Sequence, residues 1–440
     1  MVAAPETLDR AALQCKVVRS LVFSQILGGV GMASGIAVGA LLAEDLSGTE
    51  ALAGLGTTSQ VLGAALLTIP VARATAARGR RVGLRLGLSI AFVGAALVLA
   101  AAVVRSFPLF VVGMFLFGGG TTANNQTRYA AADLASPAHR GRDLSIVVWA
   151  TTIGSVAGPN LVGPGKALAH AVGLPELVGT FVFSLVGFAL AWAVVHRLLR
   201  PDPLLTARAL EAAEHEPART ASLTAQTAED AAAAEILVDH DGSMRRGLAV
   251  VRANPRAFQA MVVMALGHLV MVSVMVMTPI HMQHGHAELE VIGFVISMHI
   301  LGMYALSPLV GAAVDRWGPA PVAVSGGVVL TLAALLASRS QEGWSGLLLV
   351  ALFLLGVGWS CTLVSGSTLL TSSVTTQERP ATQGLADVLM GLAGAAGGVV
   401  AGVVIGSLGY SALATGAAVV GVVVLVVGAA RTRNAEALVS

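Results

Sequence analysis

The sequence predicts an all-α membrane protein with twelve transmembrane helices in two pseudo-repeated six-helix bundles. Of its 440 residues, 55% are hydrophobic and 11% are charged, and the mean hydropathy is +0.81. An ordinary soluble domain carries about 25% charged residues. Apolar runs long enough to cross a ~30 Å hydrocarbon core also recur along the chain. Composition and repeated runs together exclude an ordinary soluble domain.

The predicted spans are helical because their apolar runs are continuous, whereas strands of a membrane barrel alternate apolar and polar residues. Abundant Gly, Ala and Ser suit close packing of helices in a bilayer. The twelve spans are expected at residues 19–43, 51–73, 82–104, 107–132, 144–165, 176–197, 257–282, 289–312, 319–337, 344–370, 383–406 and 409–430.

Three parts are expected: an N-terminal six-helix bundle at 1–197, a cytoplasmic linker at 198–256 and a C-terminal six-helix bundle at 257–440. The linker contains no spanning run, and a surface helix is expected within it at 228–251. Beyond joining the halves, little function is expected of it.

A constant offset of 239 residues aligns the two halves. With this offset, Gly79 corresponds to Gly318, Arg140 to Arg379 and Gly158 to Gly397. Parallel six-plus-six repeats are an architecture of secondary transporters, whose substrate site lies near the membrane midplane between the halves.

Basic residues predict the orientation. If the N-terminus is cytoplasmic, the outer loops keep only Arg105, Lys166 and Arg339, whereas the inner loops carry most of the remaining arginines. Cytoplasmic loops are enriched in Lys and Arg. We therefore expect a multi-pass protein of the cell (inner) membrane with both termini cytoplasmic. Residues 1–18 lack an apolar core, so no cleavable signal peptide is expected. The lipid bilayer is the expected environment; we expect a monomer and no nucleic-acid partner.

Methionine and histidine concentrate between Met261 and Met303, where eight of the thirteen methionines and five of the ten histidines lie. At about 100° per residue, one helical face of the first segment carries Met264, His268, Met271 and Met275. In the second segment His299 and Met303 lie one turn apart. Thioether and imidazole are soft ligands that suit Cu(I). Methionine is also a common filler of apolar gaps, so the stripe equally fits helix packing.

Two motifs resemble those of the major facilitator superfamily. The loop between spans eight and nine reads Gly311-Ala-Ala-Val-Asp315-Arg316-Trp-Gly318 and is similar to the G-x-x-x-D-R-x-G loop motif. Span five contains Gly154-Ser-Val-Ala-Gly158-Pro159, similar to the G-x-x-x-G-P motif often seen in antiporters. The resemblance covers nearly the whole chain and implies the major facilitator fold and alternating access. It also implies that Asp315 and Arg316 clamp two helices in one state of the cycle. The first half carries Ala76 where this acid should be, which puts a matching clamp there in question.

A narrower resemblance concerns the metal candidates. The sequences Met271-Val-Ser-Val-Met275 and His299-Ile-Leu-Gly-Met303 lie in consecutive spans. They are similar to paired motifs of the CcoA-like copper importers. This resemblance implies that the copper ligands are Met271, Met275, His299 and Met303. Met264 and His268 would add further ligands along the route of the ion. Copper would be cargo, and no cofactor is expected. Relatives of that family that carry organic substrates, including riboflavin transporters, show that membership does not fix the cargo.

Few polar groups are expected at membrane depth, where each suggests a function. Asp387 is a candidate proton-coupling carboxylate, a helix cap or a partner of an arginine. The amides Asn124, Asn125 and Gln126 form a polar patch in span four that suits an organic substrate. No G-x-x-x-x-G-K-[ST] loop is present, so transport would draw on an ion or substrate gradient.

Three functions stay open at this point. The leading hypothesis is a secondary transporter that imports copper. The second is a proton-coupled exporter of small organic compounds or drugs, supported by the polar patch and the G-x-x-x-G-P motif. The third is a membrane sensor or scaffold that moves no solute. None of the three is an enzyme.

Overall fold

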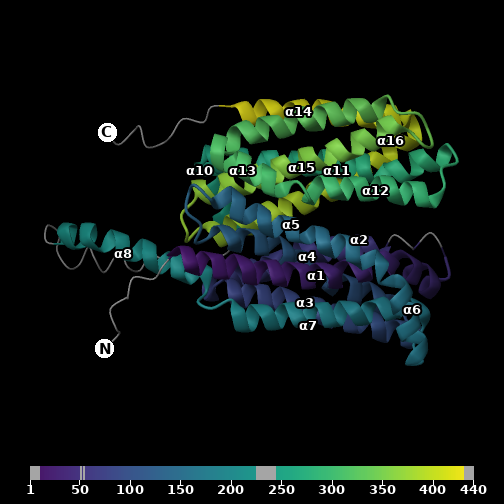
Figure 1. The fold of residues 1–440 in the computed structure, drawn as a ribbon, viewed down its shortest axis with the longest axis horizontal. Coiled ribbons are helices and arrows are strands. Elements are labelled where there is room, and N and C mark those ends of the chain that lie inside the picture. Colours follow the sequence, from purple (N-terminus) through teal and green to yellow (C-terminus); the bar gives the residue numbers. More distant parts are fainter. Residues whose placement is uncertain (1–9, 50–51, 53–54, 224–243, 431–440) are drawn as a thin grey trace.

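The computed structural model describes residues 10–49, 52, 55–223 and 244–430, and its regular elements there are all helices (Figure 1). The first half consists of α1 (Arg10–Ser47), α2 (Leu55–Arg78), α3 (Arg80–Val103), α4 (Phe107–Ala132), α5 (Arg140–Asn160), α6 (Val162–Ala171), the 3₁₀ turn Glu176–Val178 and α7 (Gly179–Leu198). The second half consists of α11 (Pro255–His284), α12 (Leu289–Tyr304), α13 (Ser307–Trp317), α14 (Pro319–Ser338), α15 (Gly346–Ser373) and α16 (Arg379–Ala429).

Twelve spans follow from these helices, as the sequence predicts. Within the described residues, ten helices are long and apolar enough to cross a membrane, and α5 with α6 forms an eleventh span bent by 55°. One of the ten is α16, whose 51 residues would reach about 77 Å at 1.5 Å per residue. Gly409, with φ of 81°, divides α16 into two helices that correspond to predicted spans eleven and twelve. Span eight is likewise divided, into α12 and α13.

The two halves repeat each other in backbone conformation. Gly79 has φ 87° and ψ 173°, and Gly318, at the predicted offset, has φ 87° and ψ 163°. Both glycines precede a helix, and their positive φ is a conformation that side chains with a Cβ rarely adopt. Arg140 and Arg379, also related by the offset, both begin helices. The offset therefore relates equivalent structural positions.

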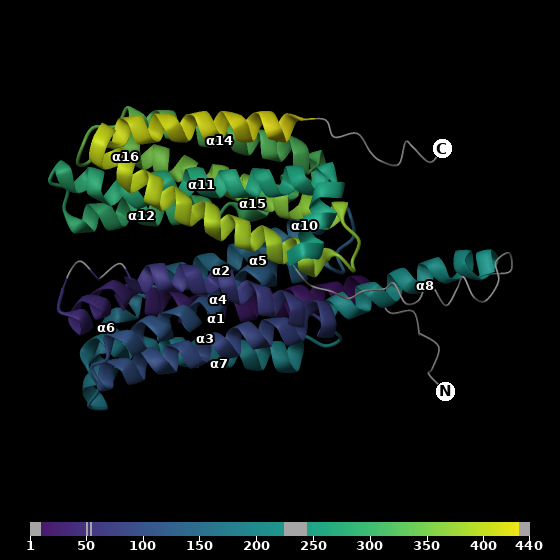
Figure 2. The ribbon, with the colours of Figure 1, turned by 180° about the vertical axis from the view of Figure 1, so that it is seen from behind.

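Both ends of the described helical core lie on one side of the molecule, which we call the terminal side; the other is the distal side. The start of α1, the end of α16, and the helices α8 (Pro203–Leu223) and α10 (Met244–Ala253) mark the terminal side (Figures 1 and 2). The sequence predicts this side to be cytoplasmic.

The linker contains more helix than expected. Helix α8 begins after Asp202, whose carboxylate accepts hydrogen bonds from the backbone N–H groups of Leu204 and Leu205 at 3.0 and 3.1 Å. Such a cap, followed by proline in the first turn, is a strong start signal for a helix. Of the surface helix predicted at 228–251, the end forms α10; residues 224–243 lie outside the described residues.

Candidate functional site

A cavity of about 730 Å³ lies between the two halves. Helices α1, α2, α4 and α5 line it from the first half, and α11, α12, α15 and α16 from the second. It extends from Arg128 and Asp387 toward the distal ends of these helices, where its lining includes Ile36, Thr57, Thr58 and Val399. On the terminal side the halves approach each other, and α13 of the second half packs against α5 of the first (Figure 1).

Amide and hydroxyl groups form the first-half wall of this cavity. The Gln25 amide donates to Thr151 Oγ1 at 2.8 Å, and the Gln60 amide donates to Thr121 Oγ1 at 3.2 Å. Asn124 and Asn125 of the predicted polar patch also line the cavity, whereas Gln126 lies beneath it. The Gln25 carbonyl oxygen is buried and accepts no hydrogen bond from any described residue. A buried acceptor without a partner is uncommon in folded proteins.

Aromatic side chains form part of the second-half wall. The Trp359 indole N–H donates to His268 Nδ1 at 3.0 Å, and the Trp359 and Tyr304 rings meet edge to face with centroids 5.6 Å apart. All three residues line the cavity. Because Nδ1 accepts this bond, a neutral His268 carries its proton on Nε2. The imidazole then offers a hydrogen-bond donor and has no free lone pair for a metal ion.

The floor of the cavity is an ion pair between the halves. Arg128 of α4 lies 2.7 Å from the carboxylate of Asp387 on α16, and both side chains are buried. The Gln126 amide donates to the other Asp387 oxygen at 2.8 Å. Asn125 Oδ1 and the Tyr129 hydroxyl accept from Arg128, each at 3.1 Å. Of the roles open for Asp387, the structure places it as the partner of an arginine.

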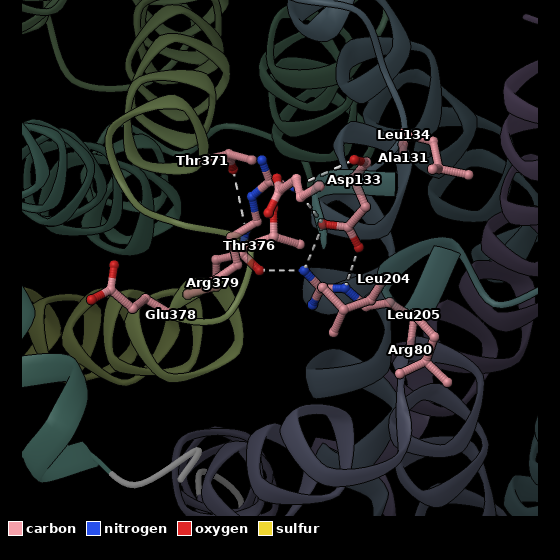
Figure 3. Close-up of polar contacts among 12 residues, drawn as sticks. Arg80, Ala131, Asp133, Leu134, Leu204, Leu205, Thr371, Thr376, Glu378 and Arg379 are labelled. Atoms are coloured by element: carbon pink, nitrogen blue, oxygen red, sulfur yellow. Dashed lines mark hydrogen bonds and ion pairs between the residues drawn. The ribbon is translucent and has the colours of Figure 1, made fainter. Parts of the chain in front are cut away.

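A second buried network lies one layer closer to the terminal side (Figure 3). Arg80 lies 2.7 Å from Asp133 and also donates to Gln126 and to Gln383 of the second half. Arg379, at the start of α16, lies 3.6 Å from the same Asp133. Neither Arg80 nor Gln383 is among the predicted site residues: Arg80 follows Gly79 in the first-half counterpart of the loop motif, and Gln383 lies outside the motifs. Together with Arg128–Asp387, this network closes the terminal side.

The loop motif of the second half forms a further contact between the halves. The Asp315 carboxylate accepts hydrogen bonds from the backbone N–H groups of Gly141 and Arg142 at 2.7 and 2.8 Å. These groups lie at the start of α5, where a helix has unsatisfied donors and favours negative charge. A Cβ on Gly311 would lie 2.6 Å from the Gly141 carbonyl, so glycine permits this approach. Arg316 instead lies over its neighbour Trp317.

The span-five motif packs α5 against α1. A Cβ on Gly154 would lie 2.5 Å from the carbonyl carbon of Gly29, and one on Gly158 would lie 2.3 Å from Ala33 Cβ. Both distances are shorter than real contacts, so the two glycines allow the helices to touch. The Pro159 side chain lies outside the described part of the chain.

The structure distributes the six metal candidates over different surroundings. His268, Met271 and Met303 line the cavity, whereas Met264, Met275 and His299 are absent from its lining. Met264 Sδ accepts from the Ser367 hydroxyl at 3.5 Å. His299 is fully buried; its Nδ1 donates to the Leu352 carbonyl at 2.8 Å, and its Nε2 has no partner among described residues. Across those residues no three His, Cys, Asp or Glu side chains are grouped to hold a metal ion, so copper would depend on the thioethers.

Comparisons with known proteins agree with this architecture. The family model described as Major Facilitator Superfamily matches residues 21–289 and 261–438. The chain is 40% identical over 390 residues to the uncharacterized MFS-type transporter YdeG of Bacillus subtilis, with 89% of this chain and 86% of the relative covered. It is 26% identical over 373 residues to the riboflavin transporter RfnT of Brucella anthropi, with 84% of each covered. The human organic anion transporter MFSD10 has a similar fold, with a TM-score of 0.71 at 18% identity over 94% of this chain and 99% of that one.

Proposed function

The chain belongs to the Major Facilitator Superfamily and is a secondary transporter that works by alternating access, and we propose that its cargo is a small organic solute. The supporting observation is the chemistry of the central cavity. Its volume of about 730 Å³ falls within the range of pockets for small molecules, roughly 300–1,000 Å³. Its wall combines apolar surface with a few amide, hydroxyl and aromatic groups that would orient a bound molecule.

We further propose that the solute contains an aromatic or heteroaromatic ring and hydroxyl groups. Trp359 and Tyr304 supply ring surface on one side of the cavity, and the amides of Gln25, Gln60 and Asn124 supply hydrogen bonds on the other. Riboflavin, which the relative RfnT is named for transporting, has this combination of a flat ring system and a polyol chain. Identity to that relative is 26%, so the proposal extends to the chemical class and not to riboflavin itself.

The test is uptake into proteoliposomes from a panel of labelled solutes that includes riboflavin, a planar drug, a sugar and copper. We expect ring-containing hydroxylated solutes to be carried and Gln60→Leu to raise KM at least tenfold, because the variant loses a wall amide. Ser325→Ala, on an exposed face of α14, is the matched control and should leave uptake unchanged. Uptake of the sugar alone, or of no organic solute, would contradict the proposal.

Copper is the second candidate, and its support is the presence of Met271 and Met303 thioethers in the cavity lining. The unpartnered Nε2 of His299 is chemically suited to a soft metal ion. On this hypothesis Met271→Ala and His299→Ala each abolish copper accumulation while expression is retained. Unchanged copper uptake in both variants would remove the metal hypothesis and leave the organic solute.

A further inference from the structure

We propose that a groove between α1 and α5 on the terminal side binds an anionic phospholipid from the surrounding membrane. The groove has a volume of about 690 Å³ and lies between the first turns of α1, the segment before α5 and the start of α5. It shares no lining residue with the transport cavity. Its occupant is therefore not the cargo, and the proposal does not depend on what the cargo is.

Positive charge dominates the rim of this groove. Arg10, Arg19 and Arg142 line it together with His139, and the single carboxylate in the lining is Asp143. The Gln14 amide donates to that carboxylate at 2.6 Å. Arg19 and Arg142 are exposed, and neither side chain forms an ion pair with any residue that the structure describes. Guanidinium groups in this arrangement suit a phosphate, which they bind by charge-assisted hydrogen bonds.

The floor of the groove is apolar. Val18, Val22 and Ile146 line it, and Phe23 lines it with 56% of its surface exposed. Phe23 lies one turn beyond Arg19, about 6 Å deeper in the membrane at 1.5 Å per residue. Trp149 is also exposed one turn beyond Ile146 on α5. An acyl chain can follow this surface while its phosphate remains at the arginines.

The combination of a basic rim and an apolar floor favours a phospholipid over a soluble anion. A free phosphate ester would contact the rim and leave the apolar floor in water, whereas a phospholipid covers both. The predicted cytoplasmic position of the rim adds to this assignment, because basic pockets between helices on that side bind anionic lipid head groups. The groove also includes the start of α5, whose N–H groups hold Asp315. A lipid in the groove would contact both α1 and α5 and so stabilise the packing of α1 against α5, the helix whose start binds Asp315.

The experiment measures lipid binding to the delipidated full-length protein by native mass spectrometry. Phosphatidylglycerol and phosphatidylcholine with identical acyl chains are titrated separately. We expect phosphatidylglycerol to bind more tightly, and Arg19→Gln with Arg142→Gln to weaken it by roughly 25-fold, since each basic residue near a membrane surface contributes about 5-fold. The matched control, Arg197→Gln with Arg256→Gln, removes two exposed arginines elsewhere on the terminal side and should bind as the wild type does.

Further measurements distinguish a bound phospholipid from a soluble phosphate ester. Phe23→Asn should weaken phosphatidylglycerol binding, and soluble glycerol phosphate should fail to displace the lipid. Phosphatidylglycerol should also raise the melting temperature of the wild type more than that of the Arg19/Arg142 variant, because a ligand stabilises the folded state that binds it. Equal binding of the two lipids, equal loss in the control variant, or displacement by glycerol phosphate would each overturn the proposal.

Discussion

The guanidinium of Arg128 lies 2.7 Å from the carboxylate of Asp387, and this ion pair joins the two halves at the floor of the transport cavity. Removing one partner of a buried ion pair commonly costs 3–5 kcal/mol, because the other charge is left unpaired. Since this pair forms between the halves, the cost falls on the state in which the terminal side is closed. A proton on Asp387 would weaken the same contact, which makes this carboxylate our candidate for proton coupling.

The first prediction is that Asp387→Asn uncouples transport from protons. The asparagine cannot titrate, so an inward proton gradient should no longer drive uptake into proteoliposomes. Exchange of labelled for unlabelled solute at equal pH should persist, because it needs no net proton movement. The double variant Arg128→Gln with Asp387→Asn controls for the unpaired arginine. Gradient-driven uptake that survives in Asp387→Asn would rule out this carboxylate as the coupling group.

The second prediction concerns the clamp between Asp315 and the start of α5. Asp315→Ala removes two hydrogen bonds to a carboxylate, each worth about 1.5–3 kcal/mol. We expect the terminal side to open more often. Spin labels at Ser136 and Thr375, in a background without Cys15 and Cys361, should report a longer distance. Arg316→Gln is the matched control, because that side chain lies over Trp317 and away from α5. An unchanged distance distribution in Asp315→Ala would show that the clamp does not hold this state.

The third prediction tests the close packing of α5 on α1. A Cβ at Gly158 would lie 2.3 Å from Ala33 Cβ, so Gly158→Val forces the helices apart. Overpacking of this kind costs about 1–3 kcal/mol. The melting temperature in detergent should fall, and less folded protein should be recovered. Gly163→Ala is the control because no atom lies within 4 Å of the added Cβ. Equal melting temperatures for the two variants would contradict the packing role.

The sequence predicted features that depend on local pattern. Runs of apolar residues identified the spans, and the offset of 239 identified Gly79 and Gly318, which share one backbone conformation. The network around Arg80 escaped prediction because its partners are distant in sequence: Gln383 is 303 residues away. No periodicity connects such residues, and only the packing of the two halves brings them together.

The methionine stripe illustrates a different limit. Helical phase predicted Met264 and Met271 on one face of α11, but phase does not determine which neighbours each side chain contacts at its own depth along the helix. Met271 lines the cavity, while Met264, two turns away, contacts Ser367 of α15. Whether the thioethers bind copper stays a prediction, which the uptake experiment decides.

The fourth prediction concerns helix α8 of the linker. This helix contacts the first half at the position where the acidic residue of the loop motif is missing. Ala76 occupies the position equivalent to Asp315, and its carbonyl accepts a hydrogen bond from Arg208 of α8 at 2.9 Å. On the same helix Glu211 accepts from the Thr376 hydroxyl, just before α16. Helix α8 thus connects the end of α2 to the start of α16, much as Asp315 connects α13 to the start of α5.

This arrangement predicts that Arg208→Gln with Glu211→Gln opens the terminal side, as Asp315→Ala does, since both variants remove charged hydrogen bonds worth about 1.5–3 kcal/mol each. The same pair of spin labels measures the change. Arg252→Gln, an exposed charge on α10, provides the control. The variants act on different helix pairs, so their effects on the opening free energy should add when combined. If the linker variant leaves the label distance unchanged while Asp315→Ala lengthens it, α8 joins the halves without holding them, and closure depends on the second-half clamp and the buried network.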